Sequence, residues 1–444
     1  MTGPLRSFPG PRLALRWPVL LLWMGAWIAG FLGDQTAQAQ LDPQGAISNP
    51  PPPGSADFRR NIQLRYNESL RSNQPDKTAK NYIDQAIHYL VYQLGVPDQA
   101  TSRVENITKI GNQLRASNTA PNARVYATDQ VILRARQLLA EPSPEVRVAA
   151  CHLLNSLNTS WNPDVPYLPV ADVLLETLTY NDAQYIAVKV VAAEGLARIL
   201  RDSPPNQLQL LKRVEISEKI AAEINRLRSS RGQAGAASKV GCDWLMWGLI
   251  RALGFSDRVM NQSRQPVVAD ALQKVLYDPN ENWLTRARAA DSLSRLPFES
   301  NTNLAVLNYE IARLLHDGAQ QYNTELAAGS INPMWRRFAL HIYMAYEAPN
   351  QATRNLKQGL MYQTGRSGLN AAASQIQSAR GLMLPIVNNW ISTPQPRPIS
   401  AADVQNLATW LNANAPAAGT KLMPESQVAP PAGREATPTP APMK

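Results

Sequence analysis

The residues of this chain best able to recognise a ligand form a column, five places after each of five recurring basic residues. The column combines two histidines, two carboxylates and one tryptophan: His152, Glu194, Trp244, Asp291 and His341. Arg198 and Arg295, nine places after their basic residues, are expected beside it. Because aromatic and arginine side chains anchor protein interfaces, this set predicts recognition of a peptide or protein surface. The alternative is an ordinary solvated face, with Trp244 packed under a neighbouring side chain.

Motifs for catalysis, cofactors or metals do not occur in the sequence. It contains no His-Glu-x-x-His pair, Walker loop, Gly-x-Ser-x-Gly elbow or Cys-x-x-Cys pair. His152 and His341 occupy equivalent places in repeats four steps apart, so we expect them to lie tens of ångströms from each other. They cannot share a metal ion, whose ligand bonds are only about 2 Å long. We therefore predict no enzyme activity, no cofactor and no metal site.

The basic residues that define the column recur along most of the chain, at positions 103, 147, 189, 239, 286, 336 and 380. By subtraction, the gaps between them are 44, 42, 50, 47, 50 and 44 residues. A period of this length is typical of helix-pair repeats that stack into a solenoid. The five best copies begin at Arg147, Lys189, Lys239, Arg286 and Arg336.

Each of these copies also carries an apolar pattern with helical spacing. A small residue stands three places after the basic residue, and large, mostly apolar residues stand seven and ten places after it; in the first copy these are Ala150, Leu154 and Leu157. Such offsets fall on one face of an α-helix, so each copy predicts a helix with a buried stripe. At about 100° per residue, the column points nearly opposite that stripe.

Turns rich in helix breakers precede these helices. Residues 131–140 lead into the proline-containing turn 141–144, and residues 269–277 lead into the turn 278–280. Proline is tolerated in the first turn of a helix and acidic residues favour its N-terminus, so both turns predict corners between two helices. Sustained alternation of apolar and polar residues is missing, and we expect little sheet.

The stretch 138–150 resembles the HEAT repeat, in which two leucines, an acidic, proline-containing turn and a Val-Arg pair precede a small residue. The resemblance implies an all-α, right-handed α-solenoid of about six to seven stacked helix pairs over residues 58–392, with the column on its concave face. It also implies that Arg147, Lys189 and Arg286 have a structural role, bracing the turn against an adjacent repeat. Lys239 and Arg336 hold the same position in copies that depart from the motif.

Residues 1–39 have the features of an export signal. Three arginines precede the apolar run 17–32 and the small-residue site 37–39, which predicts cleavage before Gln40. Export would place the protein in the periplasm, in the cell envelope or outside the cell. An uncleaved N-terminal segment would instead tether it to a membrane.

The remaining segments flank the repeats. Residues 40–57 are expected to form a flexible, Pro-rich linker. Residues 393–415 are expected to contain a short terminal helix, at 401–412. The Pro/Ala-rich tail 416–444 is expected to be disordered because its composition does not provide a core.

Charge narrows the possible partners. Removal of residues 1–39 takes away three arginines and Asp34, which leaves a net charge of (44−3) − (34−1) = +8. That charge fits an acidic partner, such as anionic lipid, an acidic polymer or an acidic protein face, but we favour the alternative of an ordinary basic surface that keeps the protein soluble. Nucleic acid is not expected, because the sequence has no dense block of Lys and Arg.

These observations predict an exported, non-enzymatic scaffold that binds a protein or peptide on a concave face. One alternative is a membrane-tethered envelope protein whose basic face contacts anionic lipid or polymer. Another is a lyase-like enzyme, although no convergent set of titratable residues supports it. The identity of the partner and the oligomeric state are left open.

Overall fold

The computed structural model describes residues 62–180, 185–230, 236–347, 359–392 and 395–430, all of which belong to one compact unit, Gln44–Lys444. This part of the chain is mostly α-helical, which confirms the predicted all-α class. The predicted signal, 1–39, and the predicted linker, 40–57, lie outside the described residues.

The described residues form helices joined by turns and loops. In the first half these are α2 (Gln63–Leu70), α3 (Lys77–Tyr92), η3 (Pro97–Ser102), α4 (Arg103–Arg115), α5 (Pro121–Leu139), α6 (Pro144–Ser156), α7 (Val170–Thr179), α8 (Ile186–Asp202) and α9 (Leu210–Ser230). The second half contains α10 (Ala236–Leu253), α11 (Val267–Tyr277), α12 (Trp283–Ser294), α13 (Leu304–Ala327), α14 (Met334–Tyr346), α15 (Leu360–Gln363), η6 (Asn370–Ala372), α16 (Ala373–Ser392) and α17 (Ala401–Ala413).

Local signals in the sequence explain where several helices begin. Helix α6 starts with Pro144 after Ser143, whose hydroxyl accepts a hydrogen bond from the backbone of Val146 at 3.4 Å. Helix α12 follows Asn282, whose Oδ1 accepts from the backbone N–H of Thr285 at 2.8 Å. Each cap satisfies one of the N–H groups that a first helical turn leaves without a partner. The corners predicted at 141–144 and 278–280 are therefore helix-to-helix turns.

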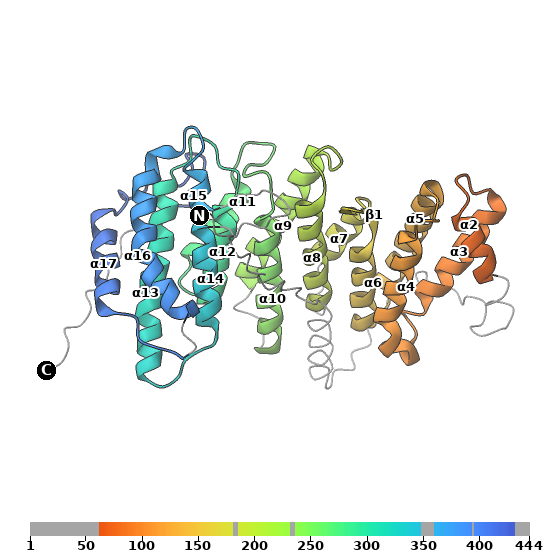
Figure 1. Ribbon diagram of the computed structural model, residues 1–444, viewed down its shortest axis with the longest axis horizontal. Helices are drawn as coiled ribbons and strands as arrows, with labels where there is room; N and C mark the ends of the chain where they lie inside the picture. The colour runs from red at the N-terminus through yellow and green to blue at the C-terminus, as the bar shows by residue number, and fades with distance from the viewer. Residues whose placement is uncertain (1–61, 181–184, 231–235, 348–358, 393–394, 431–444) are drawn as a thin grey trace, which may run out of the picture. The chain divides into compact units, whose positions relative to one another are not determined.

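Helices that follow one another in the sequence pack as pairs, and successive pairs pack on each other. Helix α5 contacts α6, α7 contacts α8, α9 contacts α10, and α11 contacts α12. The second helices also contact one another in chain order, from α4 through α6, α8, α10, α12 and α14 to α16 (Figure 1). We call them the second row, and we call α3, α5, α7, α9 and α11, which contact one another in the same way, the first row.

The predicted stripe lies in the core between these helices. In the five best copies, the residues three, seven and ten places after the basic residue are buried, except the half-buried Tyr343. Ala192 and Ala289, at the small position of their copies, are fully buried, which lets neighbouring helices approach closely. The helical period of the apolar residues thus predicted which face of each second-row helix is buried.

A small sheet interrupts the helices, in line with the expectation of little sheet, although its position was not predicted. Strands β1 (Asn158–Trp161) and β2 (Asp164–Pro166) pair antiparallel between α6 and α7, with Ser160 opposite Val165. The strands are too short for a recognisable alternation of apolar and polar residues, so the sequence pattern missed them.

The C-terminal segment corrects one prediction. The tail was expected to be disordered from Pro416, but residues 416–430 are described, and Leu422 and Met423 within them are completely buried. The backbone N–H of Asn303 donates to the carbonyl of Leu422 at 2.8 Å. Composition misled the prediction because a few apolar side chains are enough to fix a short segment onto an existing core. Residues 431–444 lie outside the described residues, and the predicted helix at 401–412 corresponds to α17.

Candidate functional site

The predicted column lies on five consecutive helices of the second row. His152 is on α6, Glu194 on α8, Trp244 on α10, Asp291 on α12 and His341 on α14, and each of these helices packs on the next. Within the column only Trp244 is exposed, whereas Asp291 is buried and the other three are half-buried. Four of the five side chains are therefore partly or fully covered, and one aromatic side chain is accessible.

The carboxylate of Asp291 holds the centre of this surface together. Its Oδ1 accepts a hydrogen bond from Nε of Arg295 at 2.6 Å, and its Oδ2 lies 3.0 Å from Nδ1 of His341. Nε2 of His341 accepts a hydrogen bond from Nε of Arg288 at 3.3 Å. His341 is then the neutral tautomer with its proton on Nδ1, where it donates to Asp291. These bonds link α12 to α14.

Arg288 extends the contacts to α10. Its guanidinium carbon lies 4.1 Å from the ring centroid of Trp247, a cation–π contact. The indole Nε1 of Trp247 donates to Oγ1 of Thr285 at 2.7 Å, which fixes the orientation of the ring. Trp244, one turn earlier on α10, packs edge-on against Trp247 with ring centroids 5.1 Å apart and is 47% exposed. Trp244 is therefore a well-supported aromatic side chain that remains open to solvent.

Arg198 was predicted to lie beside the column, but its guanidinium forms hydrogen bonds with residues at the end of α6 and in β1. It donates to the backbone carbonyl of Asn155, in the last turn of α6, and to the side-chain carbonyl of Asn158, in β1. Carbonyls of a last helical turn lack a partner within their helix, so this contact satisfies one of them. Burial lowers the pKa of Arg198, and the nearby Asp202 opposes the shift. Arg198 braces the end of α6 against the strand that follows it.

Three arginines next to the column were missed by sequence reasoning. We call them the arginine cluster: Arg251 on α10, Arg288 on α12 and Arg337 on α14. Arg251 and Arg337 are exposed and Arg288 is half-buried. The spacing of Trp244, Trp247 and Arg251 places them on one face of a helix and could have indicated Arg251. Arg288 and Arg337 lie outside the register of the column and come together only through the packing of α12 on α14.

Positive charge accumulates in the arginine cluster. Desolvation, followed by the charges of Arg337 and Arg251, lowers the pKa of Arg288 to about 10, while Asp291 acts in the opposite direction. Desolvation also lowers the pKa of Arg251, and Glu194 raises it. Like charges held this close repel one another, so the surface favours a bound anion.

Two of the basic residues with a predicted structural role donate hydrogen bonds to backbone carbonyls at or just after the end of the preceding helix. Nε of Arg286, in the first turn of α12, donates to the carbonyl of Leu276, near the end of α11, at 3.0 Å. Arg147, in the first turn of α6, donates to the carbonyl of Glu141 and lies 3.7 Å from the ring centroid of Tyr185. Both arginines are buried and fasten the corner between the two helices of a pair.

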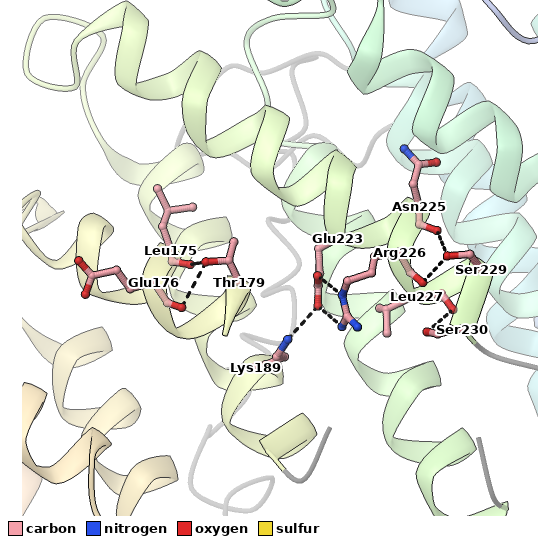
Figure 2. Close-up of polar contacts among 10 residues, drawn as sticks. All are labelled: Leu175, Glu176, Thr179, Lys189, Glu223, Asn225, Arg226, Leu227, Ser229 and Ser230. Carbon is pink, nitrogen blue, oxygen red and sulfur yellow. Dashed lines mark hydrogen bonds and ion pairs between the residues drawn. The ribbon is translucent and has the colours of Figure 1, made fainter. Parts of the chain in front are cut away.

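Lys189 is buried in a different way, because it pairs with a carboxylate. Figure 2 shows its Nζ approaching Glu223 on α9. The nitrogen lies 3.2 Å from Oε1 of Glu223, and the two side chains are 4% and 5% exposed. Arg226 approaches the same carboxylate with two hydrogen bonds of 2.6 Å. This shared carboxylate ties α8 to the following helix, α9 (Figure 2).

Lys239 and Arg336 differ from the other three repeat positions because both are exposed. They belong to the copies that depart from the HEAT-like motif, and neither follows the acidic, proline-containing turn found before Arg147. The position of a basic residue in the repeat therefore does not by itself predict whether its side chain is buried or exposed.

The described residues contain neither a candidate metal site nor a candidate membrane span. No three His, Cys, Asp or Glu side chains of these segments gather closely enough to hold a metal ion. No helix among them combines the length and apolar character needed to cross a bilayer. Comparison of the chain with protein-family models, with curated proteins and with solved structures gave no match. The resemblance to HEAT repeats therefore rests on the motif at 138–150.

Proposed function

We propose that this protein is an exported, non-enzymatic scaffold that binds a protein or peptide on the face formed by α6, α8, α10, α12 and α14. In this proposal the helix pairs form a right-handed α-solenoid of about six to seven units, and this face is concave. The ordered packing of the two rows supports the proposal, because in a solenoid each repeat contacts its neighbours.

The observation that carries the binding function is the environment of Trp244. An indole 47% exposed is held from behind by Trp247, which is itself fixed by Thr285 and Arg288. A rigid aromatic side chain loses little conformational entropy on binding, and aromatic residues next to arginines are the usual anchors of protein interfaces. The surface is therefore suited to recognising another chain.

The same geometry disfavours catalysis by the Asp291–His341 pair. A carboxylate bound to Nδ1 of a histidine is the arrangement that orients a general base. Such a base needs a free lone pair on Nε2, but Nε2 of His341 accepts a hydrogen bond from Arg288. The pair is thus part of the support of the surface.

Export rests on the N-terminal sequence. N-terminal sequencing of the protein from its native cell should give a chain that begins at Gln40. A chain that retains residues 1–39 would favour the membrane-tethered alternative, in which the basic body contacts anionic lipid or an envelope polymer.

Binding can be tested by site-specific photo-cross-linking in the native compartment. A benzoylphenylalanine at position 244 should form a discrete adduct with another protein. The matched control position is Leu133 on the first-row helix α5, which is exposed to the same extent, 47%. Equal labelling at both positions, or none at position 244, would argue against a binding face there. Trp244→Ala should weaken binding of the cross-linked protein about tenfold or more, with helicity unchanged.

A further inference from the structure

We infer that the segment bound on this face is acidic: its carboxylates contact the arginine cluster while an apolar side chain beside them packs on Trp244. This inference rests on the proposed function and specifies the chemistry of the partner. It is based on which arginines of the face are already paired and which are not.

Several arginines of the second row already have partners within the protein. Arg201 and Arg295 each form an ion pair on their own helix or at its end, with Asp202 at 2.8 Å and with Asp291 at 2.6 Å. In the described part of the chain, Arg251, Arg288 and Arg337 have no carboxylate within ion-pair distance. These three project from consecutive helices, α10, α12 and α14, which pack on one another.

The contacts of Arg288 leave part of its guanidinium available. Nε is bound to His341 and the flat face lies on Trp247, whereas its terminal nitrogens have no hydrogen-bond partner among the described residues. A guanidinium whose position is fixed in this way can bind a carboxylate with two parallel hydrogen bonds at a small entropic cost. Arg251 and Arg337 supply further positive charge next to it, as their effects on the pKa of Arg288 indicate.

An apolar contact surface lies next to this charge. Val240 and Trp244 are exposed and stand one helical turn apart on α10, on the side of the helix that continues to Trp247 and Arg251. An acidic peptide with an apolar side chain matches both the charge and the apolar surface. A lipid headgroup or a free phosphate would match the charge alone, so we assign the site to an acidic segment of a protein.

The test measures binding of a labelled synthetic peptide of Asp, Glu and Leu to the purified full-length protein by fluorescence polarisation. A peptide with Asn and Gln in place of the acids is the control ligand. The test variant is Arg251→Gln/Arg337→Gln, since both side chains are exposed and can be changed without opening the core. The control variant is Arg136→Gln/Lys219→Gln, which makes the same change of charge at exposed positions on the first-row helices α5 and α9.

The acidic peptide should bind and the amide peptide should not, and binding should weaken between roughly 50 and 300 mM NaCl. The test variant should weaken binding about tenfold or more, and the control variant by less than about twofold. Equal loss in both variants, equal binding of the amide peptide, or binding of phosphatidylglycerol vesicles without the peptide would overturn the inference. If peptide binding fails while cross-linking at position 244 persists, the acidic partner is wrong and the proposed binding function stands.

Discussion

His341 on α14 donates a hydrogen bond of 3.0 Å to Asp291 on α12, a residue fifty positions earlier in the chain. The same carboxylate binds Arg295, so Asp291 satisfies two donors on a largely covered surface. Helices α12 and α14 are thereby joined by polar contacts as well as by packing. A change at Asp291 should therefore affect both the stability of the repeats and the geometry of the face.

Asp291→Asn should lower the free energy of unfolding by about 1–3 kcal/mol, because a neutral amide cannot serve both donors and leaves a polar group unsatisfied. Equilibrium urea unfolding followed by circular dichroism measures this change. The matched control is Asp172→Asn, whose carboxylate is 58% exposed and pairs with Lys212. That variant should change stability by less than about 0.5 kcal/mol. Similar losses in the two variants would contradict a structural role for the Asp291 contacts.

Parts of this arrangement could be predicted from the sequence. The period of the basic residues and the apolar offsets gave the helices and the buried stripe, because both depend on local spacing along one helix. The environment of Trp244 was left undecided between exposure and burial, because Trp247 supports it from behind and leaves half of its surface open. Spacing alone cannot distinguish those two outcomes.

The arginine cluster and the C-terminal segment could not be predicted in the same way. Arg288 and Arg337 are neighbours because α12 packs on α14, a relationship that no local pattern encodes. Leu422 and Met423 lie in a segment with the composition of a tail, and only the presence of a receptive surface on the repeats makes them core residues. Both failures concern contacts between segments distant in the sequence.

The ion pairs of the buried Glu223 carboxylate give a second prediction: substitutions of Glu223, Lys189 and Arg226 should lower the free energy of unfolding by different amounts. Glu223 pairs with Lys189, which is buried, and with Arg226, whose side chain is 43% exposed. Glu223→Gln should cost about 3–5 kcal/mol, since it removes the carboxylate shared by two cations. Lys189→Met should cost less because Glu223 keeps its two bonds to Arg226, and Arg226→Gln should cost less than about 1 kcal/mol. Urea unfolding of the three variants measures the order of these losses in the free energy of unfolding. An Arg226 variant as unstable as the Glu223 variant would contradict the expected order.

The packed C-terminal segment gives a third prediction. Deletion of residues 416–444 should lower the free energy of unfolding by about 3 kcal/mol or more, because it exposes the sites of Leu422 and Met423. Ser426→Ala should cost about 1 kcal/mol, since it removes a hydroxyl that donates to the buried carboxylate of Asp270. Deletion of residues 431–444 alone is the control. Equal stability of the two truncated proteins would show that residues 416–430 do not contribute to the fold in solution.

Glu310 on α13 gives a prediction about pH. Burial raises the pKa of Glu310 from 4.5 to about 7, although Arg313 and Arg286 lower it. One carboxylate oxygen lies 2.6 Å from Arg313, and the other is buried without a hydrogen-bond partner in the described part of the chain. Between pH 4.5 and 7 the folded protein then binds a proton at this site that the unfolded chain has released. Its contribution to stability is present below pH 4.5 and is lost as the pH rises through 7.

Glu310→Gln keeps the shape of the side chain and removes this titration. The variant should become more stable relative to the wild type by about 1–3 kcal/mol as the pH rises from 5 to 8, since one pKa unit corresponds to about 1.4 kcal/mol. Urea unfolding of both proteins at several pH values measures the difference, in which the effects of other titrating groups cancel. Glu215→Gln, at a carboxylate 47% exposed, is the control for replacing a carboxylate by an amide. If the Glu310 variant instead loses stability relative to the wild type as the pH rises, then Glu310 is ionised across this range and its pairing with Arg313 outweighs the cost of burial.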